Sequence, residues 1–200
     1  MHEGLWEQLS ALDPKEAAPR ALCRYEADDS SGRFVITFLN NEYAVDLQDK
    51  TILPIEEGEA PGYLEQLCIL AYLINAKDVP LSNELVGEKS LPGGDFYFRA
   101  KPHELPTALL VEAFAHRPER LYEVMPAFDG TRREFGNASM QFLVLPRIRL
   151  TITIWAGDDE FPARATVLFD KTATGQLPLD ALGAAAVVGI KAVAHAATDA

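Results

Sequence analysis

The stretch from Met140 to Asp170, which reads MQFLVLPRIRLTITIWAGDDEFPARATVLFD, decides the fold class. Leu150, Ile152 and Ile154 alternate with threonine or aromatic residues, and apolar residues recur with a period of two on both sides of an acidic loop. A period of two is typical of β-strands that bury one face. The stretch therefore predicts an antiparallel meander over residues 139–170.

A second segment with this period, residues 33–47, predicts a β-hairpin. Asn40 and Asn41 would form its two-residue turn, because asparagine tolerates the positive φ angles that such turns need. This turn fixes a register that places the large apolar side chains on one face. The pairs in that register are Phe38 with Tyr43, Ile36 with Val45, and Phe34 with Leu47.

Helical patterns fill most of the remaining chain. They predict helices over residues 3–12, 14–24, 61–74, 104–115 and 118–126, an Ala-rich C-terminal helix over about 179–196, and a short strand at Phe96–Phe98. Helices and strands occur in blocks without strict alternation, which favours the α+β class. We therefore predict a single α+β domain over residues 1–200, in which an antiparallel sheet (hairpin 33–47 plus meander 139–170) packs against helices.

The charge of the chain argues against a general nucleic-acid partner. The 200 residues contain 18 Lys and Arg against 30 Asp and Glu, and the net charge of −12 makes the average surface repel phosphate backbones. Residues 99–149 differ, with 8 basic against 6 acidic side chains. This mildly basic region is suited to binding a small anion.

The cysteines and the hydropathy of the chain limit which cofactors and which cellular location we expect. Cys23 and Cys68 form no Cys-x-x-Cys pattern, so we expect no iron–sulfur cluster or structural zinc held by this chain alone. The N-terminus has no basic region followed by an apolar core, and the Ala-rich segment 184–197 is too short or too interrupted for a membrane span. We expect a cytoplasmic protein that does not associate with membranes.

The acidic loop of the meander is a candidate cation site. Asp158, Asp159 and Glu160 offer carboxylate oxygens of the kind that magnesium and calcium bind, and Asp170 or Asp129 would contribute the rest. The alternative is a solvated hairpin loop whose acids keep the sheet edge soluble.

Arg147, Arg149 and His103 are candidates for binding and acid–base chemistry. The two arginines flank one residue, so in an extended strand they point to the same face, where they would suit a carboxylate or phosphate. The alternative is pairing with the protein's own surplus acids. His103, near a predicted helix start, is the candidate acid or base.

The segment Gly93-Gly94-Asp95 is a candidate anion loop. Glycines there would let backbone amides approach an anion closely. The alternative needs no ligand, because Pro92-Gly93 fits the centre of a type II turn.

Four motifs in this order resemble a known family. They are Lys77–Ser82, Leu91–Gly94 leading into Phe96–Phe98, Trp155–Pro162 and Leu168–Asp170. The chain resembles, over residues 5–183, an uncharacterised bacterial and archaeal family of unknown function, frequent in anaerobes and sometimes fused to a four-cysteine iron–sulfur module. The resemblance implies a functional surface at the loops 78–82, 91–95 and 155–162, and a partner that carries the cluster. It supplies no catalytic residue.

Three hypotheses follow, and the first two use loops that we expect to converge in one recess. The first is a non-catalytic accessory domain that binds a small ligand or a redox or one-carbon protein partner, through residues Asp78, Gly93, Gly94, Asp95, Arg147, Arg149 and Trp155. The second is a metal-dependent hydrolase or lyase, with a divalent cation at Asp158, Asp159 and Glu160 and with His103 as the base. The third is an obligate dimer formed by an exposed sheet face.

Overall fold

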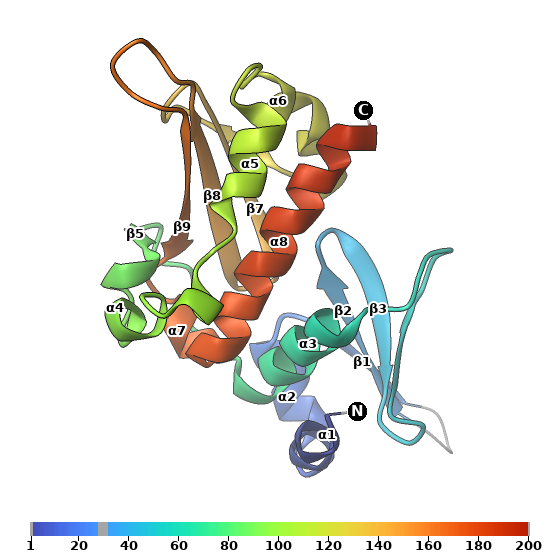
Figure 1. Cartoon of the computed structure of the whole chain (residues 1–200). Helices are drawn as coiled ribbons and strands as arrows, with labels where there is room; N and C mark the ends of the chain where they lie inside the picture. The colour runs from blue at the N-terminus through green and yellow to red at the C-terminus, as the bar shows by residue number, and fades with distance from the viewer. Residues whose placement is uncertain (1, 28–31, 200) are drawn as a thin grey trace.

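The computed structural model describes residues 2–27 and 32–199 and confirms the α+β class (Figure 1). The helices are α1 (Glu3–Ser10), α2 (Pro14–Arg20), α3 (Tyr63–Asn75), η1 (Glu88–Ser90), α4 (Gly94–Tyr97), η2 (Lys101–His103), α5 (Thr107–Phe114), α6 (Arg120–Val124), η3 (Met125–Phe128), α7 (Ala173–Gln176) and α8 (Leu179–Asp199). The strands are β1 (Arg24–Ala27), β2 (Gly32–Phe38), β3 (Asn41–Asp46), β4 (Thr51–Pro54), β5 (Leu85–Gly87), β6 (Thr131–Arg133), β7 (Ala138–Leu145), β8 (Ile148–Trp155) and β9 (Arg164–Asp170).

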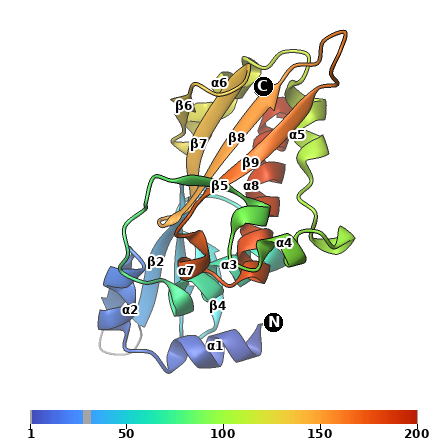
Figure 2. The same cartoon turned by 90° about the vertical axis from the view of Figure 1, so that its left-hand side faces the viewer.

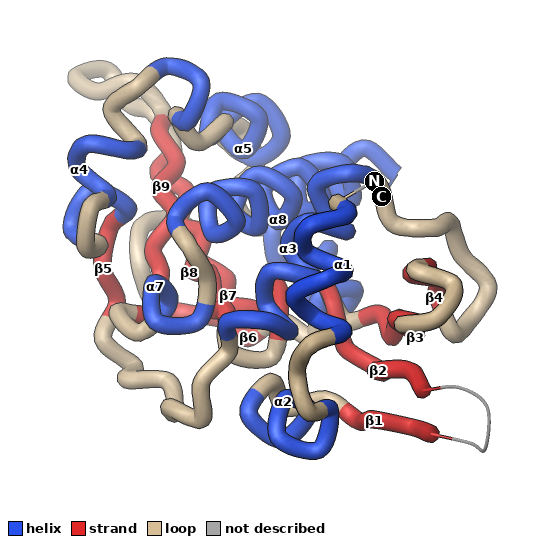
Figure 3. Tube along the Cα trace, turned by 90° about the horizontal axis from the view of Figure 1, so that it is seen from below, coloured by secondary structure: helices blue, strands red, loops and turns tan. Residues whose placement is uncertain are grey.

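The hairpin and the meander belong to two antiparallel sheets, not to one. The first sheet has the order β1-β2-β3-β4, and the second has the order β5-β9-β8-β7-β6. Helices α3 and α8 run side by side between them (Figure 3). One continuous cluster of buried apolar side chains joins both sheets to these helices.

The turn of the predicted hairpin lies one residue earlier than expected. Leu39 and Asn40 occupy it, with φ angles of 47° and 66°, as a two-residue hairpin turn requires. Positive φ is unfavourable for leucine. Leu39 adopts it because its side chain packs into the core and its N–H donates a hydrogen bond to the Val144 carbonyl, 3.0 Å away, on the other sheet.

The predicted register of this hairpin is therefore wrong, although the predicted buried face is right. The observed pairs are Phe38 with Asn41, Ile36 with Tyr43, and Phe34 with Val45. Each residue of β2 now faces a partner two positions earlier in β3, and a shift of two positions leaves every side chain on its original face.

The meander is confirmed as β7, β8 and β9, and one face of it packs against helices. Met140, Leu150 and Phe169 lie on that face and are fully buried. Helices α5 and α8 cover it (Figure 1). Gly189 of α8 permits the close packing, because a Cβ atom there would lie 3.1 Å from Leu150 Cδ1. The opposite face, called the outer face below, is turned to the viewer in Figure 2 and has no helix over it.

The predicted strand at Phe96–Phe98 is instead helical. The Gly94 N–H donates to the Leu91 carbonyl at 2.8 Å and Gly93 has φ 76°, so a type II turn leads directly into α4. Phe96 is 90% exposed, whereas Phe98 is buried against Phe169. The three consecutive aromatic residues thus lie on one turn of helix, and only one of their rings is buried.

Helix α8 confirms the predicted C-terminal helix, whereas its apolar segment is longer than the expectation of a stretch too short or too interrupted for a membrane span allowed. By length and composition alone, Leu179–Thr198 could cross a membrane. A little over half of this segment, 56%, is buried inside the protein, as in a core helix. The cytoplasmic location stays a prediction.

Candidate functional site

Two of the residues that the sequence singled out, Arg147 and Trp155, lie at opposite ends of β8 (Figure 2). Arg147 directly precedes this strand and Trp155 is its last residue. An eight-residue strand spans roughly 25 Å at about 3.3 Å per residue. The expectation that all these loops form one recess is therefore wrong.

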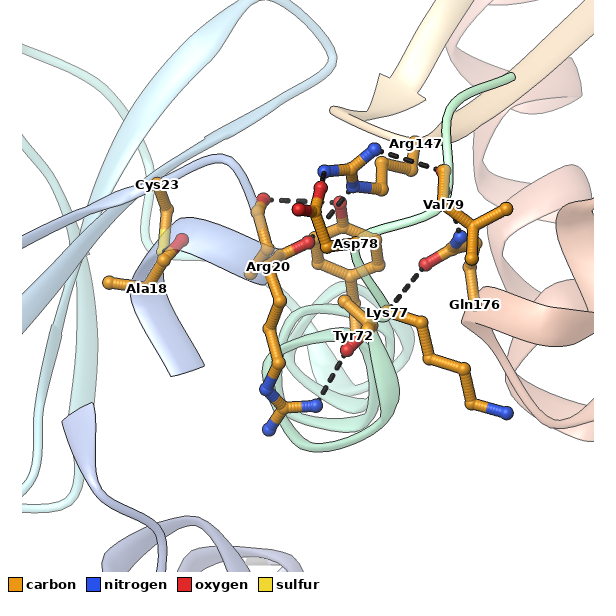
Figure 4. A network of polar contacts seen from close by, with 11 residues as sticks. Ala18, Arg20, Cys23, Tyr72, Lys77, Asp78, Val79, Arg147 and Gln176 are labelled. Carbon is orange, nitrogen blue, oxygen red and sulfur yellow. Dashed lines mark hydrogen bonds and ion pairs between the residues drawn. The ribbon is translucent and has the colours of Figure 1, made fainter. Parts of the chain in front are cut away.

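At the lower end, Arg147 holds the segment 77–79 in place (Figure 4). Its side chain is 6% exposed, and its three nitrogens donate to Asp78 Oδ1 at 2.6 Å and to the carbonyls of Val79 and Arg20, both at 2.9 Å. Every nitrogen of the guanidinium is thus engaged by protein acceptors. Arg147 acts as a structural clamp, as the pairing alternative predicted.

Gln176 completes this clamp from α7 (Figure 4). Its side chain is buried, and it accepts a hydrogen bond from the Lys77 N–H at 2.8 Å and donates to the Val79 carbonyl at 3.4 Å. Beside it, Tyr72 donates to the Ala21 carbonyl at 3.1 Å, and burial raises the pKa of its hydroxyl. The buried polar groups here are satisfied by one another.

Asp170 holds the next part of the same loop. It is fully buried, and its carboxylate accepts hydrogen bonds from Ser82, Asn83 and Thr172 at 2.7–3.0 Å. Burial alone would raise the pKa of Asp170, but the hydrogen bonds from Thr172 and Ser82 lower it to about 2. Asp170 also lies at the end of β9 away from the loop of Asp158, so it cannot complete a cation shell with that loop.

Arg149 contacts this loop from the outer face. Its Nη1 donates to Asn83 Oδ1 at 2.6 Å, and its Nε lies 2.7 Å from the Gln141 amide oxygen once that amide is oriented to accept. Arg147 and Arg149 therefore both hold residues 77–84 in place.

Turn geometry and packing account for the glycines at 93 and 94. A Cβ atom at Gly94 would lie 2.0 Å from the Glu88 carbonyl oxygen, and Gly93 needs its positive φ for the turn. Asp95 pairs with Arg99 at 2.8 Å on the surface. The type II turn alternative explains these residues.

At the upper end, Trp155 and Arg164 face each other across the β8–β9 ladder. The guanidinium carbon of Arg164 lies 4.4 Å from the centre of the Trp155 ring. Together with Asn137, Asp158, Phe161 and neighbouring residues, this pair lines a pocket of about 550 Å³, called the Trp155 pocket below.

The loop between β8 and β9 is shaped by its own hydrogen bonds. Asp158 Oδ1 accepts from the N–H groups of Glu160 and Phe161 at 2.9 and 2.7 Å, and Asn137 Oδ1 accepts from the Ala156 N–H at 2.9 Å. The Asp158 carboxylate thus stabilises the conformation of the loop backbone. The side chain of Phe161, in the same loop, is 67% exposed. The loop presents an aromatic ring and acids to solvent.

The side chains that a metal enzyme would need do not come together among residues 2–27 and 32–199. Within them, no three His, Cys, Asp or Glu side chains gather as ligands for a metal ion. His103 stacks on Tyr97 with ring centres 4.1 Å apart, and both line a separate cavity beside α8 that shares no residue with the Trp155 pocket.

The strands β6–β9 carry an excess of positive charge in an acidic chain. They contain four arginines and one acid, the buried Asp170. Arg132, Arg133 and Arg164 each lie over an aromatic ring, and none of the three forms an ion pair within the described residues. Aromatic faces hold these cations without neutralising them.

Sequence reasoning missed Arg164, Asn137 and Gln176. Counting outward from the acidic loop of the predicted meander would have placed Arg164 opposite Trp155, because antiparallel pairing fixes that relation. No sequence signal marks Gln176, a single amide in a connecting segment.

The fold and these two sites define a small α+β protein with two antiparallel sheets, a polar clamp and a cationic aromatic pocket. The chain belongs to the family described as a domain of unknown function (DUF3786), whose model matches residues 13–192. This match confirms the resemblance to an uncharacterised family. Neither the search of curated proteins nor the search of solved structures gives a match.

Proposed function

We propose that this protein is a non-catalytic accessory domain that binds an acidic segment of a partner protein at the upper end of the five-stranded sheet. The observation that carries the proposal is the pair of Arg164 and Trp155. Arg164 lines an open pocket, lies over an indole ring and has no carboxylate partner within the described residues. A cation held in this way is available to a carboxylate from outside.

The surroundings of the pair favour a protein partner. Trp and Arg are the side chains that contribute most often to the energy of protein interfaces. Phe161, at the rim of the Trp155 pocket, adds an exposed apolar ring. Arg133 and Arg149 extend the positive charge along the outer face.

Binding also fits the chemistry of the pocket better than catalysis does. The guanidinium of Arg164 offers five N–H donors and a positive charge, which suits it to binding a carboxylate. The two other polar side chains that line the pocket, Asn137 and Asp158, accept hydrogen bonds from the loop backbone. These two groups orient the loop, so the indole ring of Trp155 and the guanidinium of Arg164 are the groups that would recognise a partner.

A redox or one-carbon partner is part of this proposal. The family resemblance implies an associated iron–sulfur module, and the thiols of this chain are poor candidates to hold a cluster. Burial raises the pKa of Cys68 and raises that of Cys23 to about 12, which disfavours the thiolate that a cluster needs. The cluster would therefore come with the partner.

The test is affinity capture from the lysate of the source organism, with quantification by mass spectrometry. The wild-type chain is compared with Arg164→Glu and with the control Arg117→Glu, an exposed arginine near α6 that is already paired with Glu119 and Glu123. We expect a captured protein whose yield falls at least tenfold with Arg164→Glu and stays unchanged with Arg117→Glu. Equal capture by all three chains, or no capture by any, would contradict the proposal.

A further inference from the structure

The edge of β9 is only partly covered. On the side away from β8, the neighbouring strand β5 pairs with Leu168, Phe169 and Asp170 alone. Within the described residues, no strand pairs with residues 164–167 on that side, and no turn or loop backbone bonds to them. More than half of the seven-residue strand β9 is therefore an open edge, where backbone N–H and C=O groups can accept another strand.

A groove lies beside this open edge. It has a volume of about 400 Å³ and is lined by Ala165, Thr166 and Val167 on one side and by the segment 98–107 on the other. Phe98 and Leu105, both buried, give it an apolar floor. The groove therefore combines an unpaired strand edge with an apolar surface for side chains.

The charges around the groove favour an acidic occupant. Lys89, Arg99 and Lys101 line it together with Glu88 and Glu104. Lys89 and Lys101 form no ion pair within the described residues, whereas Arg99 pairs with Asp95. Arg164, which lines the Trp155 pocket, directly precedes Ala165 of the groove, so the pocket and the groove are bordered by consecutive residues of β9.

We infer that an extended segment of the partner adds to β9 as a new strand, in line with β5, with apolar residues alternating with acidic ones. Side chains alternate between the two faces of a strand. In the added strand, one set would therefore lie with Ala165 and Val167 over the apolar floor, and the other set with Arg164 and Thr166 on the outer face. Recognition of this kind combines backbone hydrogen bonds with selected side-chain positions. This inference rests on the proposed binding function and adds the mode of binding.

The experiment uses a synthetic probe, the peptide acetyl-Glu-Val-Glu-Val-Glu-Val-amide with a fluorescent label, and the full-length chain. Binding is followed by fluorescence anisotropy, and amide hydrogen exchange reports where the peptide lies. We expect saturable binding, slower exchange at residues 164–167, and no binding of the matched peptide in which lysine replaces glutamate.

Two N-methylated peptides test the strand addition itself. Successive amides of an extended peptide point to opposite edges, so methylating alternate nitrogens blocks one edge at a time. We expect one methylated peptide to bind at least tenfold more weakly and the other to bind as the parent does. The double variant Lys89→Glu/Lys101→Glu should lose at least tenfold in affinity, and the control Lys15→Glu, on α2, should lose none.

The outcomes separate this inference from the proposed function. If both methylated peptides bind equally, or if protection appears away from residues 164–167, the inference is overturned. If no peptide binds while partner capture still depends on Arg164, strand addition is overturned and the proposed function stands. If capture also fails, both are overturned. Concentration-dependent dimerisation that buries residues 164–167 would assign the edge to a second copy of this chain and would overturn the inference.

Discussion

Arg147 and Asp78 form an ion pair whose two members differ greatly in exposure: 6% of the Arg147 side chain reaches solvent, against 84% of the Asp78 side chain. The buried member also donates to two backbone carbonyls from different parts of the chain. The pair is therefore less a surface salt bridge than a cation that joins α2, the loop 77–84 and the β7–β8 turn.

This asymmetry predicts unequal effects of removing the two partners. Arg147→Met removes the Arg147 donor from the Arg20 carbonyl and leaves the Val79 carbonyl with only the longer bond from Gln176, so it should lower the free energy of unfolding by about 2–4 kcal/mol. Asp78→Asn keeps an acceptor at an exposed position and should cost about 1 kcal/mol or less. Urea denaturation measures both. Equal losses would show that the ion pair, not the carbonyl contacts, carries the stability.

The lowered pKa of Asp170 predicts that the protein loses stability in acid. This pKa is lowered from 3.8 to about 2 in the folded protein, so the contribution of Asp170 is fully present above about pH 4 and disappears as the pH falls through about 2. A shift of this size corresponds to about 2 kcal/mol. Asp170→Asn should remove this part of the pH dependence, measured by urea denaturation at pH 5 and pH 2. The control Asp159→Asn, in an exposed loop, should retain it.

The buried hydroxyl of Thr151 predicts that replacing this residue by valine is neutral or stabilising. Its Oγ1 is buried and has no hydrogen-bond partner within the described residues. Thr151→Val keeps the shape and removes the unsatisfied hydroxyl, so stability should stay the same or rise by about 1 kcal/mol. On the same strand, Thr153 bonds to Ser139 at 3.0 Å, and Thr153→Val should instead cost about 1 kcal/mol. Thermal melts compare the two variants, and a destabilised Thr151→Val would contradict this reading.

Added divalent cations should leave the melting temperature unchanged. A bound ion stabilises the folded state in proportion to its occupancy. Asp158 already accepts two backbone N–H groups, so we expect a change below about 1 °C with millimolar magnesium, manganese or calcium. A rise of several degrees that disappears in Asp158→Asn/Asp159→Asn would instead support the metal-enzyme hypothesis.

The sequence predicts strands and helices here better than it predicts how they meet. The meander 139–170 follows from its period alone, but the register shift between Leu143 and Leu145 does not. The hairpin turn at Leu39 does not either, because a contact with Val144 on the other sheet selects its backbone conformation. Tertiary packing likewise makes Phe96–Phe98 helical, since only Phe98 is needed in the core.

The candidate site was predicted in part. Trp155 and the acidic loop were singled out correctly as neighbours, because they adjoin in the sequence. Arg147, Gly93 and Gly94 were grouped with them on motif character, yet Arg147 fixes a loop at the other end of β8 and the two glycines form the turn that leads into α4. Motif character does not distinguish a residue that holds a loop from one that binds a ligand; the number of acceptors around its side chain does.

Binding at the Trp155 pocket is tested most directly by titrating the ¹⁵N-labelled chain with its captured partner and observing the indole N–H of Trp155. The spectrum contains two indole signals, and Trp155→Phe identifies the one that belongs to the pocket. We expect this signal to shift in a saturable manner, and we expect Arg164→Glu to weaken the binding at least tenfold. An unmoved Trp155 signal with the partner fully bound, or equal affinity in Arg164→Glu, would contradict it.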